Sequence, residues 1–172
     1  MDIFHLHYQE GVRQLLRAIE LARRTGDPRT ELFAHFWAIY GLTFMGGDHE
    51  SLQSHADSLQ PLAENLRDRF WLVQALIARF GAALNSGDLR SARTFGNEAL
   101  ALSPMDTRTV GGVLRLEYEL GNFEQGKAYV EQLREARRLM TPAPTIAFMS
   151  SSVSLAHIAH NTGVWDGMDL VQ

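Results

Sequence analysis

The chain has 172 residues, 45% of them apolar and 21% charged, which is enough apolar side chain to form a buried core in a soluble protein. Its formal net charge of −4 argues against the basic surface that nucleic-acid binding requires, and the absence of cysteine excludes disulfides and thiolate metal sites. No apolar run approaches the length of a membrane span and the first residues lack the pattern of a signal peptide, so we expect no membrane segment and a cytoplasmic location.

Helical periodicity runs through the whole sequence, and no stretch shows the alternation that is typical of strands. The first four helices are expected at about His7–Thr25, Pro28–Met45, His49–Arg67 and Arg69–Asn85. Gly26 ends the first helix, and Asp27 caps the second with Pro28 at its first position, where a missing N–H costs nothing. Pro61 lies inside the third helix, which is expected to bend there and continue.

The second half of the chain predicts four more helices and a short last piece. They are expected at Leu89–Leu102, from Pro104 to Leu120, Phe123–Leu139, about Thr145–His160 and Trp165–Val171. Ser103 followed by Pro104 is interpreted as the cap and first residue of the sixth helix. The basic residues Arg23 and Arg24, and those around Arg137, fall in last turns of helices, where positive charge complements the helix dipole.

An internal repeat is the most informative feature of the sequence. The segment Phe36–Asp48 aligns with Leu76–Asp88 at a spacing of 40, and Leu21–Asp27 aligns with Leu62–Asp68 at a spacing of 41. Repeats of this length are typical of solenoids, in which each unit buries its apolar face by stacking on its neighbours. We therefore expect helical hairpins, with tight turns at Gly47, Gly87, Gly121 and Gly163.

One of these turn spacings, from Gly87 to Gly121, is 34 residues, which is the length of a tetratricopeptide repeat. The segment GDLRSARTFGNEALALSP resembles the second half of such a repeat, with Gly87 at the turn, Ala92 and Ala99 as small packing positions and Pro104 closing the unit. Other units depart from the family pattern, because Tyr40 and Phe80 stand where the family prefers a small residue. The resemblance implies an all-α fold, a right-handed superhelix of about four tetratricopeptide-like hairpins.

The order of elements in nearly the whole chain is also similar to the long-repeat C-terminal regions of bacterial signal-transduction ATPases. Proteins of that group combine an NTPase module and a tetratricopeptide-like array with a LuxR-type DNA-binding domain or a nucleotide-cyclase domain. The resemblance implies that residues 1–172 form a single repeat domain of a larger transcriptional or signalling regulator. No phosphate-binding loop of the GxxxxGKS/T kind occurs in this chain, so the NTPase activity would lie elsewhere.

The histidines and acidic residues predict no catalytic, metal or cofactor site. His157 and His160 can share a helix face, but no HExxH spacing or nearby carboxylate accompanies them, and a solvated pair is the simpler interpretation. His49 and His55 are six residues apart and do not share a face. The sequence therefore favours a non-catalytic interaction module without cofactors.

A concave face formed by the first helix of each hairpin is the expected binding surface. Counting back from each turn glycine predicts the residues that line it: Trp37, Phe44, Ile77, Leu84, Arg108, Arg115, Tyr118 and His157. Such a surface suits an amphipathic or acidic peptide, held by aromatic anchors and by arginines that pair with carboxylates. Burial of the same aromatic residues in the core is an equal alternative for Trp37 and Phe44.

Three functions stay open on the sequence. Binding of a protein or peptide segment is favoured, and the resemblance to regulators adds a small-molecule inducer site, expected near Arg115 and His157 as the second possibility. The third is self-association to a homodimer through the segment around Trp165. None of the three involves direct contact of this chain with nucleic acid.

Overall fold

The computed structural model describes residues 7–46, 49–140 and 146–163, and for Phe44, residues 146–150 and residues 161–162 it describes the backbone alone. Within these ranges the fold is all-α, without a strand. The helices are α1 (Tyr8–Thr25), α2 (Pro28–Met45), α3 (His49–Leu66), α4 (Arg69–Ser86), α5 (Leu89–Leu102), α6 (Thr107–Glu119), α7 (Phe123–Arg138) and α8 (Ile146–Thr162). The predicted helix content is therefore confirmed.

Apart from the start of α6, the ends of these eight helices lie within two residues of the predicted ones. The predicted last piece, Trp165–Val171, lies outside the described residues. Ser103 and Pro104 were expected to begin this helix, but it begins three residues later, at Thr107. The Asp106 carboxylate accepts hydrogen bonds from the backbone N–H groups of Arg108 and Thr109, at 3.0 and 3.1 Å. A carboxylate that satisfies two backbone donors is a better cap than a serine hydroxyl beside a proline, so Asp106 sets the start of the helix.

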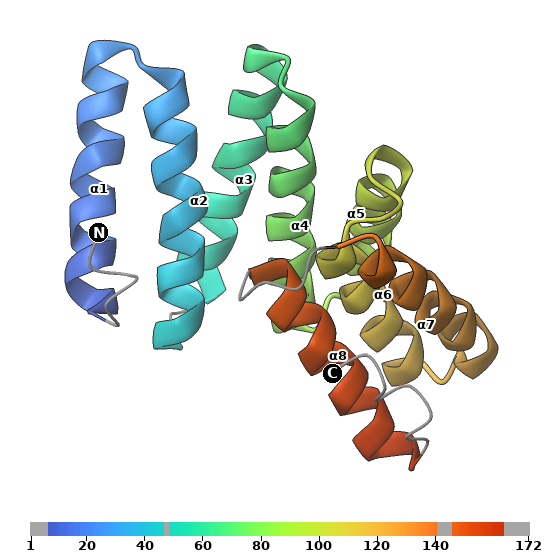
Figure 1. The fold of residues 1–172 in the computed structure, drawn as a ribbon. Coiled ribbons are helices and arrows are strands. Elements are labelled where there is room, and N and C mark those ends of the chain that lie inside the picture. Colours follow the sequence, from blue (N-terminus) through green and yellow to red (C-terminus); the bar gives the residue numbers. More distant parts are fainter. Residues whose placement is uncertain (1–6, 47–48, 141–145, 164–172) are drawn as a thin grey trace. The chain divides into compact units, whose positions relative to one another are not determined.

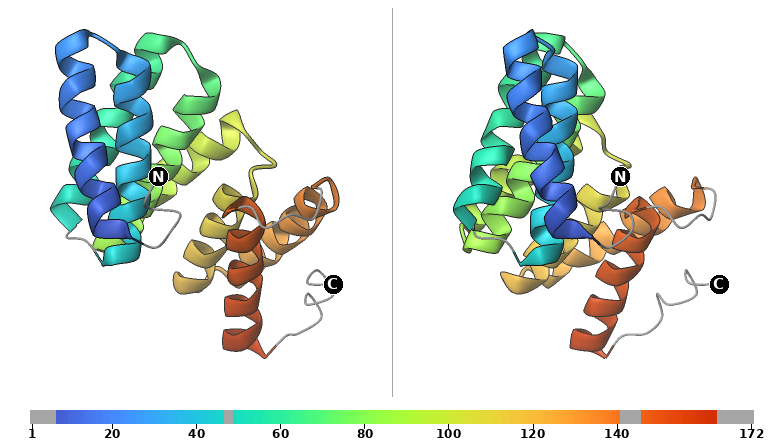
Figure 2. Two further views of the ribbon diagram at one scale, coloured as in Figure 1. Left: turned by 60° about the vertical axis from the view of Figure 1, so that its left-hand side comes forward. Right: turned by 90° about the vertical axis from the view of Figure 1, so that its left-hand side faces the viewer.

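Residue contacts divide the chain into two units, residues 1–95 and 96–172, so that α5 belongs in part to each. In unit 1, the helices α1 to α4 lie side by side in chain order, and each runs opposite to the one before it (Figure 1). Figure 2 shows these helices from two other sides. In addition, α2 contacts α4, so alternate helices of this unit also meet.

The two hairpins of unit 1, α1–α2 and α3–α4, are structural repeats. All four helices have 18 residues. Each hairpin turns through one residue in the left-handed conformation, Gly26 at φ 68° and Arg67 at φ 50°, which are 41 positions apart. An aspartate follows in both turns and caps the next helix, because Asp27 and Asp68 each accept hydrogen bonds from two backbone N–H groups.

The same spacing of 41 residues holds at the other end of α2 and α4. The left-handed residues that end these helices are Gly46, at φ 64°, and Gly87, at φ 76°. The sequence match at a spacing of 40 places the turn at Gly47, which lies outside the described residues. The structural register is therefore one residue longer, because Gly46 provides the positive φ that ends the helix. Three of the other predicted turns, at Gly26, Gly121 and Gly163, also have a positive φ.

Two clusters of buried apolar side chains are described in unit 1. Leu15 and Ile19 of α1 pack on Ala34 and Ala38 of α2. The second cluster joins α2, α3 and α4 through Leu32, Leu59, Ala63 and Ala75. The buried residues of α1 and α3 follow a helical stripe, as the periodicity of the sequence predicts.

In unit 2, small residues allow close packing of α6 against α7 and α8. A methyl group added at Gly111 would lie 2.8 Å from the hydroxyl of Ser154, and one at Gly126 would overlap the ring of Tyr118, whose closest atom is Cε2. Since real side chains do not approach so closely, these glycines let the helices touch. Val110, Leu114, Leu133, Leu155 and Ile158 form the buried cluster of this unit.

Arg137 has a structural role that its position in a last turn did not indicate. Its side chain is buried at 6% exposure, and its guanidinium donates hydrogen bonds to the hydroxyls of Ser151 and Ser152, at 2.7 and 2.8 Å. These bonds join α7 to α8. Of the helices described, none combines the length and apolar character needed to cross a bilayer.

Candidate functional site

The predicted binding residues of unit 1 lie on α2 and α4. Trp37 packs against the cluster around Leu15 and Ile19, so part of its indole belongs to the interface with α1. Ile77 and Leu84 of α4 are half-buried. Phe44 lies in α2, but its side chain is outside the described residues. The four predicted residues therefore share one pair of contacting helices, α2 and α4.

Two of the predicted residues of unit 2 are arginines that already hold partners. Arg108 is held in its own turn, because its Nη2 donates to the Asp106 carboxylate at 2.7 Å and its side chain is 17% exposed. Arg115 lies 3.8 Å from Glu119, one turn along α6, and its side chain is 43% exposed. Arg115 is therefore the more accessible of the two, since an exposed pair of this kind is weak and easily broken.

The two other predicted residues of unit 2 differ in exposure. Tyr118 covers Gly126 and packs edge-on against Phe123, at 5.6 Å between ring centroids. Its main role in the fold is to seal α6 against α7. His157 is exposed on α8.

Aromatic rings gather on the N-terminal halves of α2 and α4. The ring of Phe33 meets those of Trp37 and Trp71 edge-on, at centroid distances of 6.0 and 6.4 Å. Phe36 lies 5.4 Å from Trp71, and Phe70 lies beside the same indole at 5.2 Å. Phe33 and Phe70 are 44% and 61% exposed. We call these five residues the aromatic surface.

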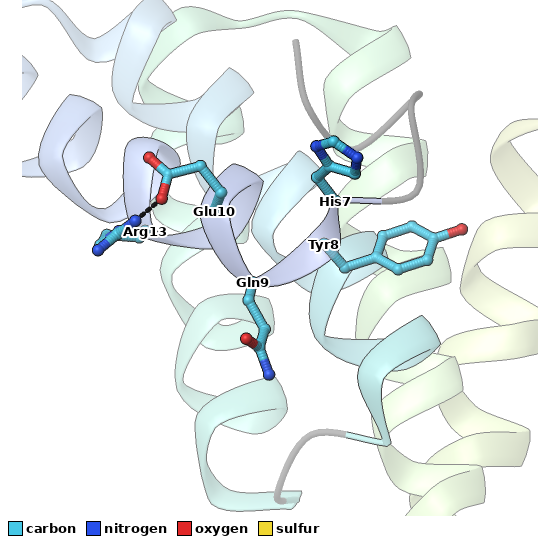
Figure 3. A pocket seen from close by; sticks show the side chains of 5 residues that line it. All are labelled: His7, Tyr8, Gln9, Glu10 and Arg13. Carbon is cyan, nitrogen blue, oxygen red and sulfur yellow. Dashed lines mark ion pairs between the residues drawn. The ribbon is translucent and has the colours of Figure 1, made fainter.

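Two hollows are described on unit 1, and the first lies at the start of α1. It has a volume of about 560 Å³ and is lined by His7, Tyr8, Gln9, Glu10 and Arg13. Figure 3 shows that these side chains spread around the helix and do not point toward a common centre, apart from the ion pair of Glu10 with Arg13. Because a binding site needs polar groups that converge, this hollow is a weak candidate.

The second hollow, which we call the histidine cleft, lies where α1, α2 and α3 meet and has a volume of about 380 Å³. Its apolar wall includes Leu16 and Ile19 of α1. Its polar lining includes Arg23 and Arg24 of α1, His35 of α2, and Ser54, His55 and Ser58 of α3. The exposed carboxylate of Glu20 lies on its rim. Here polar groups from three helices converge.

A hydrogen bond between two imidazoles forms the base of the histidine cleft. The Nδ1 atoms of His35 and His55 are 2.8 Å apart, and His35 is 3% exposed. The ring centroids are 5.0 Å apart, about the separation of two imidazoles whose Nδ1 atoms point end-on at each other. One nitrogen must carry the proton and the other must accept it.

Arg23 decides which nitrogen carries that proton. Its Nη2 lies 3.2 Å from Nε2 of His35, and because a guanidinium only donates, Nε2 of His35 must accept. His35 therefore carries its proton on Nδ1 and donates to Nδ1 of His55. His55 in turn carries its proton on Nε2. The Nε of Arg23 donates to Glu31 at 2.6 Å, which holds the guanidinium in this position.

Both imidazoles are neutral at pH 7. Burial, the neighbouring His55 ring and the positive charge of Arg23 lower the pKa of His35 to about 4. Burial and Arg23 also lower the pKa of His55. The negative charge of Glu31 raises the pKa of His35, but its carboxylate is 3.7 Å from Nε2 of that ring and is already bonded to Arg23. The cluster is therefore a chain of directed hydrogen bonds between neutral rings.

This geometry favours hydrogen bonding over metal binding or general base catalysis. Two imidazoles that share a metal direct their lone pairs at a common point, whereas these Nδ1 atoms face each other. The described residues contain no group of three or more His, Asp or Glu side chains arranged to hold a metal ion. A histidine that acts as a general base usually donates its second N–H to a carboxylate, which raises its basicity. Nδ1 of His55 instead accepts a hydrogen bond from the N–H of His35, which lowers the basicity of the ring.

His35 was not among the residues predicted from the sequence, and His55 was considered only in relation to His49. The available signal was the position of His35, the one histidine within the mostly apolar run LFAHFWAIYGLTF. Arg23 was interpreted as a residue that complements the end of its helix. It does lie in the last turn of α1, but it also bonds to Glu31 and His35 of α2.

The chain was compared with models of known protein families, with curated proteins and with solved structures. None of the three comparisons finds a match.

Proposed function

We propose that the chain is a non-catalytic interaction module that binds a peptide or protein segment through the helices α2 and α4. The observation that carries the proposal is the aromatic surface, where Phe33 and Phe70 are 44% and 61% exposed beside two tryptophans. Aromatic side chains are enriched among the residues that dominate binding energy in protein interfaces. Exposed rings that already contact one another offer a rigid apolar surface to a partner.

The structural repeat of unit 1 supports a tetratricopeptide-like architecture for this module. In such arrays the first helices of successive hairpins line one face. With the hairpins counted from their turns at Gly46 and Gly87, α2 and α4 are the first helices, and they contact each other. Counting back from the left-handed Gly46, in place of Gly47, puts Phe33, Phe36 and Tyr40 on that face. We extend the proposal to one right-handed superhelical array over residues 1–172, as part of a cytoplasmic bacterial regulator of the LuxR or nucleotide-cyclase-linked kind.

Substitution of the two exposed phenylalanines tests the proposal. The wild-type chain and the variant Phe33→Asp/Phe70→Asp are immobilised, and the proteins that each retains from a bacterial lysate are quantified. The matched control is Leu21→Asp/Leu139→Asp, which changes two apolar residues that are 59% and 71% exposed. Circular dichroism checks that the helix content of each variant is unchanged.

We expect the wild-type chain and the control to retain a defined set of proteins. The aromatic variant should retain at least tenfold less of these proteins. Direct binding of a purified member of that set, weakened by the same substitutions, would complete the test. Retention of the same proteins by all three chains would show that the aromatic surface does not bind a partner.

A second proposed function is the sensing of a small molecule, and the histidine cleft is the observation that favours it. Its volume of about 380 Å³ is within the range of ligand sites, and its polar groups come from three helices. A ligand that binds only the folded chain raises the temperature of unfolding. A thermal-shift screen with bacterial metabolites tests this function, and the absence of any stabilising metabolite at millimolar concentration would remove it.

A further inference from the structure

The buried polar cluster is not a requirement of the fold. His35 corresponds to Leu76 in the next hairpin at the structural spacing of 41, and Leu76 is 3% exposed. Glu31 corresponds in the same way to Leu72. The second hairpin therefore forms the same helices and turns with apolar residues at the positions where the first hairpin has a histidine and a glutamate. Since burying polar groups costs free energy, these residues need an explanation other than stability.

The cluster presents one oriented donor to the cleft. His55 is fixed with its proton on Nε2, because its Nδ1 accepts from His35. Within the described residues Nε2 of His55 has no hydrogen-bond partner, and it is not among the buried nitrogen atoms. A neutral N–H held in this way recognises an acceptor oxygen, and it cannot serve as an acceptor itself.

The rest of the cleft adds positive charge, hydroxyl groups and an apolar wall. Arg24 is exposed and forms no ion pair within the described residues, so its guanidinium is available for a carboxylate. Leu16 is 47% exposed, and the wall that it forms suits a short aliphatic chain. Glu20 lies on the same rim, and its negative charge disfavours a ligand with two negative charges.

We propose that the histidine cleft binds a small aliphatic monocarboxylate, with its carboxylate accepting from Nε2–H of His55 and from Arg24, and its alkyl chain against Leu16 and Ile19. Arg23, Glu31 and His35 are positioning residues, because they act through the orientation of His55. This assignment rests on the second proposed function, and it does not depend on the aromatic surface.

Isothermal titration of the full chain with butyrate at pH 7 tests the proposal. Butyramide, which has the same shape without the charge, and inorganic phosphate are the comparison ligands. His55→Phe removes the donor but keeps an aromatic ring, and Arg24→Met removes the charge. The matched controls are His49→Phe, at an exposed histidine of α3 that does not line the cleft, and Arg17→Met, at an exposed arginine of α1.

We expect saturable binding of butyrate at one site with a Kd of about 1 to 10 mM, the range for a ligand of this size. Butyramide and phosphate should bind at least tenfold more weakly, as should butyrate to His55→Phe and Arg24→Met. The two control variants should bind like the wild-type chain.

Three results would overturn the proposal. One is the absence of saturable binding up to about 50 mM butyrate, and another is equal binding by all four variants. The third is binding of butyramide or phosphate as tight as that of butyrate. Because no protein partner is present, these results leave the capture experiment unaffected. If the thermal-shift screen then finds a stabilising metabolite of another class, the sensing function still holds and only the assigned ligand class is wrong.

Discussion

In unit 1, the hairpins α1–α2 and α3–α4 have helices of the same length and turns of the same geometry, yet they differ in what they bury. The first holds His35, bonded to Arg23 and His55, where the second holds Leu76. The comparison separates the residues that specify the fold from those that do not. Left-handed turn residues and aspartate caps recur in both hairpins, whereas the polar cluster occurs once.

The largest change in stability is expected when Leu76 of the second hairpin is replaced by the histidine of the first. We expect Leu76→His to destabilise the chain by about 4 kcal/mol, because it removes a buried leucine and buries an imidazole that has no equivalent of Arg23 or His55 beside it. Urea unfolding followed by circular dichroism measures this loss. A change below about 1 kcal/mol would show that position 76 accepts a histidine without the partners that surround position 35.

The buried His35 of the first hairpin should also make the stability of the chain depend on pH. The pKa of His35 is about 4 in the folded chain and near 6.5 when unfolded, so the unfolded state takes up the proton first as the pH falls. The stability due to neutral His35 is complete above pH 6.5 and is lost toward pH 4. The lowered pKa of His55 acts in the same direction. The difference for His35 corresponds to about 3 kcal/mol.

Urea unfolding between pH 7.5 and 4 checks this expectation against the variant His35→Leu, which copies the second hairpin. We expect the variant to be within about 1 kcal/mol of the wild-type chain at pH 7 and to lose much less stability on acidification. Parallel curves for the two chains would contradict the role assigned to His35.

A smaller effect is expected at the turns, where the two hairpins differ in one residue. Arg67 adopts a φ of 50°, which costs a residue with a Cβ atom free energy that glycine does not lose. Arg67→Gly should stabilise the chain by about 0.5 kcal/mol, since the greater freedom of glycine in the unfolded chain offsets part of the gain. Gly26→Arg is the reverse exchange and should destabilise by about 1 kcal/mol. Urea midpoints that move in the opposite sense for either variant would contradict this explanation.

Much of the fold could be predicted because its signals are local. Gly26 followed by Asp27 and Pro28 specifies a helix end and a helix start within three residues. The start of α6 was missed because Ser103 and Pro104 form an equally familiar signal, and only the structure shows that the Asp106 carboxylate reaches two backbone donors. The register of α2 was missed by one residue because Gly46 and Gly47 are adjacent and either can end a helix.

The candidate site was harder to predict because it depends on contacts between helices. Arg23, His35 and His55 are separated by 12 and 20 positions and belong to three helices. Each has an ordinary local interpretation, and only packing shows that one orients the next. Trp37 illustrates the same limit, because its contact with the cluster around Leu15 and Ile19 depends on how α1 packs against α2, which its spacing along α2 does not show.

The central claim is that Arg23 fixes the protons of the two histidines, and nitrogen NMR of the imidazole rings at pH 7 tests it most directly. The predicted spectrum shows His35 protonated on Nδ1 and His55 protonated on Nε2, with both rings neutral. The substitution Arg23→Met should remove this preference. A spectrum in which His55 carries its proton on Nδ1, or in which either ring is charged, would contradict the account.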